Sequence, residues 1–296
     1  MILFWARRGV RIFRVDNPHT KPLALWEYMI EKVQDTFPDT IFLSEAFTRP
    51  KMMLALAKAG FTQSYTYFTW RNSKQELIQY FTELNEPAVA DFFRPNLWPN
   101  TPDILPTLLQ NGGRGAFLQR AALTTLLSPV YGIYSGFELC ECAAMPGKEE
   151  YLDSEKYQWK ERDWNAPGNI KGFITRLNRI RRENRALHQF RNLAFHPVEN
   201  EHVLCFSKVT EARDNMLLVV VSLDPWHPHR TFVHVPLELL GIARDEVYQV
   251  HDLLSDERYL WSGSRNYVEL HPDERTVHVF RVRRKLLREM DFETYR

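Results

Sequence analysis

The sequence predicts an α/β fold with a parallel sheet, followed by an antiparallel β-sandwich, and three observations lead to this prediction. Through residue 190, apolar runs of strand length alternate with amphipathic stretches of helix length. Beyond that point, short apolar runs follow one another with turn residues between them, which is typical of a sandwich. The 296 residues are 44% hydrophobic, enough for a sizeable core. We therefore expect an α/β unit over residues 1–190 and a β-sandwich domain over residues 191–296.

The α/β unit is expected to contain five strands joined by helices. Residues 1–8 have the pattern of a helix end, and Gly9 supplies its C-terminal stop. Because strands and helices then alternate, the strands are expected to be parallel, with helical crossovers between them. The strands are expected at residues 9–15, 40–44, 64–70, 91–98 and 129–134, and the helices at residues 22–36, 50–59, 73–84, 103–110 and 114–127.

The later part of the chain begins with a long loop and a long helix. Residues 136–169 are polar, aromatic and low in periodicity, which favours a loop lying over the strand ends. Residues 170–190 have the spacing of an amphipathic helix, whose row of arginines we interpret as a solvated face rather than an anion site. The antiparallel strands are expected at residues 203–208, 216–223, 231–235, 248–253, 267–270 and 276–282.

Charge and cysteine content limit the classes of partner and compartment. The 38 lysines and arginines nearly balance the 37 aspartates and glutamates, so the net charge of +1 argues against nucleic-acid or membrane binding. No stretch reaches the roughly 18 apolar residues that a membrane span needs. Cys140 and Cys142 lack a second cysteine or histidine pair nearby, which favours unpaired thiols in a reducing compartment over a zinc site. We therefore predict a cytoplasmic protein.

Three acidic side chains follow expected strands, close to the point where each strand ends. Asp16 and Glu45 directly follow the first and second expected strands, and Asp103 follows the fourth. A single acid in such a place is as often a helix cap as a catalyst. Because the carboxyl ends of parallel strands meet at one edge of a sheet, the three acids together predict one site.

The chemistry that these acids allow is double displacement at a sugar. Two carboxyl groups about 5 Å apart across an anomeric carbon give retention of configuration. We assign Asp16 as the nucleophile, because Arg14 lies two residues before it on the same strand face and would hold it ionised. Glu45 is assigned as the acid/base, because burial at its strand end raises a carboxyl pKa. Asp103 would stabilise positive charge in the transition state, and His19 is a candidate ligand for a sugar hydroxyl. Rings near this edge could stack on sugars: Tyr131, Tyr134, Phe137, Tyr157, Trp159 and Trp164.

These residues resemble motifs of the α-amylase superfamily of retaining glycoside hydrolases and transglycosylases. RVD at residues 14–16 resembles its nucleophile region, FLSE at residues 42–45 its acid/base region, and NTPD at residues 100–103 its stabilising-aspartate region. Where the superfamily usually has histidine before that aspartate, this sequence has Pro102.

Longer motifs are similar to one family, the α-1,4-glucan:maltose-1-phosphate maltosyltransferases. Two further stretches, YSGFE at residues 134–138 and SEKY at residues 154–157, continue the similarity. The most specific motifs are FRVDNPHTKP at residues 13–22, LSEAFTRP at residues 43–50 and WPNTPDIL at residues 98–105.

The resemblance implies a reaction and a set of contacts. The donor would be α-maltose 1-phosphate, the intermediate a β-maltosyl ester on Asp16, and the acceptor the non-reducing 4-hydroxyl of an α-1,4-glucan such as glycogen. Asn17 matches a phosphate contact of the family, and Lys156 and Tyr157 match a donor-maltose region. No metal or organic cofactor is implied. The family forms homodimers, through regions with no counterpart in this sequence.

The resemblance also implies a partial TIM (β/α)8 barrel, because the five expected strands correspond to about strands four to eight of the family's eight. An open edge strand would then be exposed, so we expect the chain alone to be poorly stable and inactive. Two other interpretations stay open: an α-amylase-type glucan hydrolase or transglycosylase, and a non-catalytic glucan-binding fragment.

Overall fold

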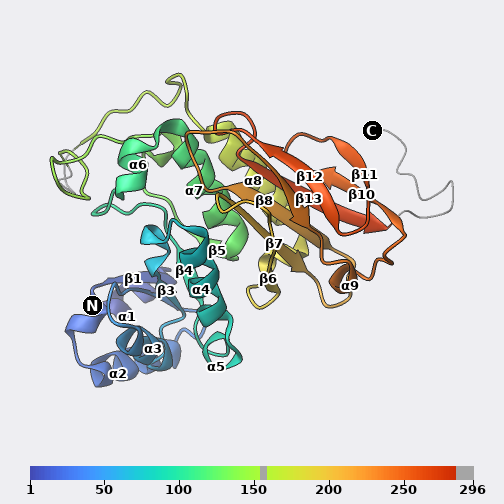
Figure 1. Ribbon diagram of the computed structural model, residues 1–296. Coiled ribbons are helices and arrows are strands. Elements are labelled where there is room, and N and C mark those ends of the chain that lie inside the picture. Colours follow the sequence, from blue (N-terminus) through green and yellow to red (C-terminus); the bar gives the residue numbers. More distant parts are fainter. Residues whose placement is uncertain (154–158, 285–296) are drawn as a thin grey trace.

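A five-stranded parallel sheet forms the N-terminal part of the molecule (Figure 1), as expected from the alternation of strands and helices. The computed structural model describes residues 1–153 and 159–284. The sheet order follows the chain, β1-β2-β3-β4-β5, and every neighbouring pair is parallel. The strands are β1 (Ile12–Asp16), β2 (Ile41–Glu45), β3 (Gln63–Tyr65), β4 (Pro95–Leu97) and β5 (Val130–Tyr131).

Helices connect these strands, and their ends follow the local signals in the sequence. Ser73 caps α4 with a capping box, in which its hydroxyl accepts from the Glu76 backbone N–H and the Glu76 carboxylate accepts from the Ser73 N–H. Gly60 follows α3 with a φ of +109°, a conformation that glycine adopts without strain. The helices are α1 (Ile2–Ala6), α2 (Leu23–Gln34), α3 (Pro50–Lys58), α4 (Lys74–Asn85), α5 (Pro87–Ala90), α6 (Thr107–Asn111), α7 (Gly113–Leu127) and α8 (Lys171–Glu183), with 3-10 turns η1 (Pro18–Thr20), η2 (Tyr67–Trp70), η3 (Phe137–Leu139) and η4 (Arg185–His188).

The third strand is shorter than expected, because a buried arginine holds the chain after it in a turn. The strand expected over residues 64–70 ends at Tyr65, and η2 follows. Arg120 of α7 is 1% exposed and donates to the carbonyls of Phe68, at 2.7 Å, and Arg71, at 2.8 Å. In an extended strand, the carbonyls of Phe68 and Arg71 would accept hydrogen bonds from groups other than Arg120. A contact between distant residues therefore overrides the local preference of an aromatic, β-prone stretch.

The long helix expected over residues 170–190 ends early, at Glu183. Asn184, which is fully buried, donates from its amide to the Ile180 carbonyl at 2.7 Å. Its side-chain oxygen accepts from Asn215 Nδ2 at 2.9 Å. The turn that carries Asn215, in the antiparallel region, thus holds Asn184 in place at the end of α8. The short η4 takes the place of the last helical turns that were expected.

The C-terminal part contains two antiparallel sheets, in agreement with the expected antiparallel strands. Two strands were missed: β6 is only four residues long, and β11 is an edge strand with mostly exposed residues. The six-stranded sheet has the order β11-β10-β13-β8-β7-β6, and the two-stranded sheet pairs β12 with β9. Their bounds are β6 (Leu193–His196), β7 (Val203–Val209), β8 (Met216–Ser222), β9 (His229–His234), β10 (Val247–Asp252), β11 (Arg258–Ser262), β12 (Arg265–Leu270) and β13 (Val277–Arg284), with a short helix α9 (Leu237–Leu240).

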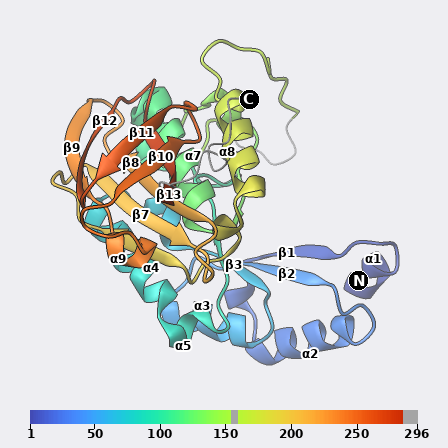
Figure 2. The ribbon, with the colours of Figure 1, turned by 90° about the vertical axis from the view of Figure 1, so that its right-hand side faces the viewer.

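Strand β8 is buried on both faces and joins the two parts of the molecule. Leu217, Val219 and Val221 face α7 and α8, whereas Leu218 and Val220 face the core between the two antiparallel sheets. This two-sided burial explains why β8 reads as a continuous apolar run rather than an alternating one. Figure 2 shows α7 and α8 along one side of the six-stranded sheet. The division of the chain at residue 191 stays a prediction.

Candidate active site

Asp16 and Glu45 lie next to each other at the ends of β1 and β2. The two residues are directly paired in the parallel register of these strands. Parallel strands end at one edge of the sheet, so the pairing places both carboxyl groups there, as predicted. Their environments differ: the Asp16 side chain is 59% exposed and the Glu45 side chain only 5%. Two acids at neighbouring positions therefore have different electrostatic surroundings.

Arg14 contacts both acids. Its Nη1 lies 3.8 Å from Asp16 Oδ1, and its Nη2 forms a close ion pair with Glu45 Oε1. The position two residues before Asp16 puts the guanidinium on the same face of β1. The sequence predicted a contact with Asp16, and the structure adds the closer one with Glu45. The guanidinium also lies 6.0 Å from the ring centroid of Tyr65.

The pKa of Glu45 is raised from 4.5 to about 7. Burial is the largest cause, followed by a hydrogen bond with Asp16, and the negative charges of Asp16 and Asp103 act in the same direction. The positive charge of Arg14 opposes them. A carboxyl group with this pKa holds its proton at neutral pH in about half of the molecules, so Glu45 can both donate and accept a proton.

Asp103 lies in a tight turn after β4, close enough for its charge to raise the pKa of Glu45. The turn is closed by two backbone hydrogen bonds between Thr101 and Ile104, of 3.0 and 3.2 Å. Asn100, fully buried, accepts from the Tyr134 N–H at 3.0 Å and so ties the turn to the segment after β5. The structure therefore brings all three predicted acids to one edge of the sheet.

Two predicted binding residues follow Asp16 directly. Asn17 has a left-handed φ of 43°, which asparagine tolerates better than most residues, and its amide donates to Asp16 Oδ1 at 3.2 Å. His19 lies in η1, half-buried, and within the described residues its buried Nδ1 has no hydrogen-bond partner. The Trp26 indole donates to the Pro18 carbonyl at 2.8 Å and fixes this turn. Lys156 and Tyr157 lie outside the described residues.

Two aromatic residues of the site were not predicted. Tyr65 and Trp98 stack with their ring centroids 4.8 Å apart, and Tyr65 lies between Arg14 and this indole. A side chain at Gly132 would meet the Trp98 ring at 2.1 Å, so only glycine leaves room for the stack. Tyr65 ends β3 as Asp16 and Glu45 end β1 and β2. The strand expected from the sequence runs to residue 70, so the strand-end rule would have missed Tyr65, which the early end of β3 places beside the acids.

The aromatic residues expected to stack on sugars occupy unlike environments. Phe137 is fully buried and packs against Phe117, so it belongs to the core. Tyr131 donates its hydroxyl to Asn178 at 2.8 Å, on α8. Trp159 and Trp164 are exposed, by 89% and 44%. Among the described rings of this set, Trp159 and Trp164 present the most surface, and Tyr131 and Tyr134 are half-buried. Tyr157 lies outside the described residues.

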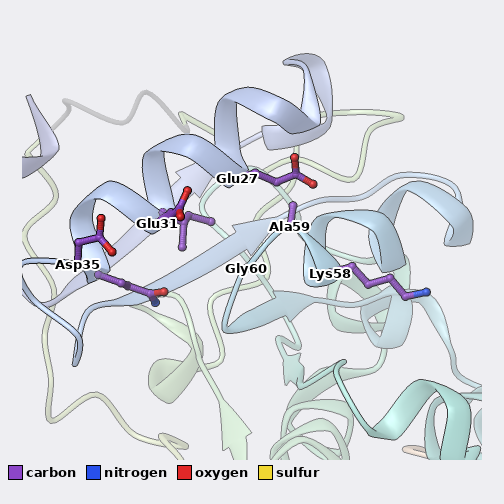
Figure 3. Close-up of a pocket in the computed structure, with 8 residues that line it drawn as sticks. Glu27, Glu31, Asp35, Lys58, Ala59 and Gly60 are labelled. Atoms are coloured by element: carbon purple, nitrogen blue, oxygen red, sulfur yellow. The ribbon is translucent and has the colours of Figure 1, made fainter.

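A hollow on the outer helical layer lies apart from Asp16, Glu45 and Asp103. It is lined by α2 and by the end of α3. Figure 3 shows Glu27, Glu31 and Asp35 in a row along α2, with Lys58 extending away from them. Residues spaced by four lie on one helix face, so the row is a solvated acidic face. None of the predicted site residues that the structure describes lines this hollow.

The fold defines the class of protein. A solved α-amylase from Geobacillus thermoleovorans, complexed with acarbose, matches with a TM-score of 0.73 over 96% of this chain and 62% of its own, at 13% identity. An Anoxybacillus α-amylase matches with the same TM-score of 0.73, over 96% and 61%, also at 13% identity. The chain thus has an α-amylase-type mixed α/β fold with a parallel sheet and antiparallel sheets. Within the described residues, no helix is long and apolar enough to span a membrane.

Sequence comparison then identifies the particular relatives. The α-1,4-glucan:maltose-1-phosphate maltosyltransferase of Myxococcus xanthus is 54% identical over 285 residues, which are 95% of this chain and 43% of the relative. The enzyme of the same name from Pseudomonas aeruginosa is 52% identical over 96% of this chain and 43% of its own length. A family model described as "GLGE, C-terminal" matches residues 195–282. The predicted resemblance is confirmed: over nearly all its length the chain corresponds to part of these maltosyltransferases, and it spans about 43% of their length.

Proposed function

We propose that this chain carries the catalytic acids of a retaining maltosyltransferase, which moves maltosyl units from α-maltose 1-phosphate to the non-reducing end of α-1,4-glucans. The observation that carries the proposal is the pairing of Asp16 and Glu45 at neighbouring strand ends, with Arg14 in contact with both. The names of relatives 52–54% identical to this chain support the choice of donor and acceptor. Exposed Asp16 is the nucleophile, and buried Glu45 is the acid/base.

In the first step, a carboxylate oxygen of Asp16 attacks the anomeric carbon of the donor. The bond from that carbon to the phosphate oxygen breaks, and the phosphate leaves with the bonding electrons and the proton of Glu45. Asn17, whose amide lies beside Asp16, binds the leaving phosphate. Asp103 stabilises the positive charge that develops on the sugar ring. The product is a β-maltosyl ester on Asp16.

In the second step, the acceptor replaces the phosphate. Glu45, now ionised, takes the proton of the acceptor's 4-hydroxyl, and the oxygen attacks the anomeric carbon while the ester bond to Asp16 breaks. Two inversions give overall retention. A pKa of about 7 suits both halves of this cycle, because the same group must give a proton and then take one near neutral pH. Lys156 and Tyr157 are proposed to contact the donor maltose.

We also propose that the parallel sheet is about strands four to eight of a (β/α)8 barrel, followed by the C-terminal sandwich at residues 191–296. Strand β1 lies at one edge of the sheet. An apolar groove runs along it, lined by α1, β1 and α2. Ile12 and Tyr28 are 58% and 62% exposed on these elements. Further strands of a longer polypeptide would cover this surface, as in a closed barrel.

The test joins the N-terminal part of the Myxococcus xanthus relative ahead of this chain. The hybrid protein is expected to release phosphate from α-maltose 1-phosphate when glycogen is present and to lengthen the glycogen chains. Asp16→Asn should lower the rate on the order of a thousandfold or more. Asp35→Asn, which removes an acid 59% exposed directly after α2, is the matched control and should leave the rate unchanged. In Glu45→Ala, the peptide that contains Asp16 should gain the mass of one maltosyl unit.

Three results would contradict the proposal. Release of maltose without glycogen would mean that water is the preferred acceptor, as in an α-amylase-type hydrolase. Binding of glycogen without phosphate release would indicate a non-catalytic glucan-binding protein. An undiminished rate in Asp16→Asn would remove Asp16 from the role of nucleophile.

A further inference from the structure

A cluster of histidine and aspartate side chains lies in the antiparallel region, on elements that carry none of the proposed catalytic acids. His202 precedes β7, Asp224 follows β8, and His229 begins β9. One ligand atom from each of these three residues lies within 4.8 Å of the other two. Within residues 1–153 and 159–284, this is the one group of three such residues close enough to hold a metal ion. Two segments converge on it: the turn before β7 and the connection between β8 and β9.

The side chains of the cluster already face one another. His229 Nε2 lies 3.0 Å from Asp224 Oδ2, and His227 Nδ1 lies 3.0 Å from the same oxygen. The rings of His202 and His229 stack with centroids 5.0 Å apart. Asp224 and His229 are largely buried, with side chains 11% and 14% exposed, whereas His202 is exposed. The cluster is therefore partly shielded and open to solvent on one side.

The loop that carries Asp224 is held in place on both sides. Asp224 Oδ1 accepts from the backbone N–H of Trp226 at 2.8 Å and of His227 at 3.2 Å, which leaves Oδ2 turned to the imidazoles. Pro225 presses against α7, since a side chain at Gly115 would meet the Pro225 carbonyl oxygen at 2.5 Å. The aspartate is thus positioned before any ligand binds, which lowers the entropy cost of binding.

We propose that His202, Asp224 and His229 form a binding site for one Zn²⁺ ion, with the ring of His227, whose side chain is 74% exposed, available as the fourth ligand. Imidazole nitrogen and carboxylate oxygen are ligands that zinc prefers, at about 2.0–2.2 Å and in tetrahedral geometry. Tetrahedral ligands at that length are about 3.3 Å apart. The present 3.0 Å contact of Asp224 with His229 is close to this spacing, and the other ligand atoms need small side-chain rotations.

The charges around the cluster fit a cation. Asp224 supplies the carboxylate of the cluster, and its Oδ2 faces the imidazoles of His227 and His229, at 3.0 Å from each. The ammonium of Lys74 is nearby but occupied by the carbonyls of Val198 and Asn200, at 3.4 and 3.0 Å. One carboxylate and neutral imidazoles would leave a zinc complex with one positive charge.

Zinc binding requires a change of tautomer at His229. The contact of His229 Nε2 with an ionised carboxylate requires this nitrogen to carry hydrogen when no metal is bound. In the zinc complex the Nε2 lone pair binds the metal and the single ring hydrogen moves to Nδ1, so the imidazole stays neutral and no net proton is released. Asn200 lies 3.3 Å from Nδ1, and its side-chain amide can turn its oxygen toward that N–H.

The site would cross-link the antiparallel region where it packs on α7, so its role is structural. It does not depend on the proposed reaction, and its test needs no substrate.

The full 296-residue chain is freed of metal with a chelator, and its cysteines are alkylated, because Cys142 is exposed and thiolates also bind zinc. Zn²⁺ is then titrated against a chromophoric zinc indicator at pH 7.5. One equivalent should bind, while Mg²⁺ and Ca²⁺, which prefer oxygen ligands, should not compete.

Matched variants identify the ligands. His229→Gln and His202→Gln should each weaken zinc affinity at least tenfold. His251→Gln is the control, because His251 forms a histidine–aspartate pair with Asp256 elsewhere in the same region, and its affinity should equal that of the parent chain. His202 is exposed, so its variant should fold even if His229→Gln does not. Co²⁺ should give the visible absorption of a tetrahedral site in the parent and lose it in His202→Gln. The absence of stoichiometric zinc binding, or equal affinity in His202→Gln and His251→Gln, would overturn the proposal.

Discussion

The environment of Glu45 predicts a distinctive dependence of stability on pH. Its pKa is about 7 in the folded chain, against 4.5 when unperturbed. Between these values the folded state binds more protons than the unfolded state, so the free energy of unfolding falls as the pH rises through this window. A difference of about 2.5 units corresponds to about 3 kcal/mol at most. The neighbouring Asp16 side chain is 59% exposed, so water screens its interaction with Glu45. We therefore expect the free energy of unfolding to change by about 2 kcal/mol across this window.

Glu45→Gln isolates this contribution, because glutamine has nearly the shape of the protonated acid and does not titrate. Urea unfolding of the parent and the variant at pH 4.5, 6, 7 and 8 gives the difference between them at each pH. From pH 4.5 to pH 8, the free energy of unfolding of the variant should rise by about 2 kcal/mol relative to that of the parent. Glu31→Gln, which removes an exposed carboxyl on α2, is the control for charge alone. A difference between Glu45→Gln and the parent that stays constant with pH would refute the raised pKa and the acid/base role built on it.

Two further predictions concern buried cations. Arg120→Met should lower the free energy of unfolding by about 2–4 kcal/mol in urea denaturation, because the carbonyls of Phe68 and Arg71 lose their buried donor; no change would show that water replaces the guanidinium. Lys208 is fully buried, and burial lowers its pKa from 10.5 to about 7. The unfolded chain binds more protons between these values, so the parent should gain about 2–4 kcal/mol of stability from pH 7 to pH 10, and Lys208→Met should abolish this gain. Equal slopes in the two proteins would contradict that pKa.

The sequence by itself determined the order of the elements and the edge at which the acids lie. Alternation of strand and helix patterns specified a parallel sheet, and a parallel sheet puts every strand's carboxyl end on one side. Asp16 and Glu45 could therefore be placed together without coordinates. These inferences need only local periodicity and the geometry of the sheet.

Only the tertiary structure decided which partners these residues meet. The closest contact of Arg14 is with Glu45 rather than Asp16, and η2 replaces a strand because Arg120, about 50 residues later in the chain, holds its carbonyls. The zinc site we propose likewise depends on His202 and Asp224, which approach only when β7 and β8 pair. A sequence records the distance between residues along the chain, whereas ion pairs, burial and metal ligation depend on distances through space, which the packing of the whole chain determines.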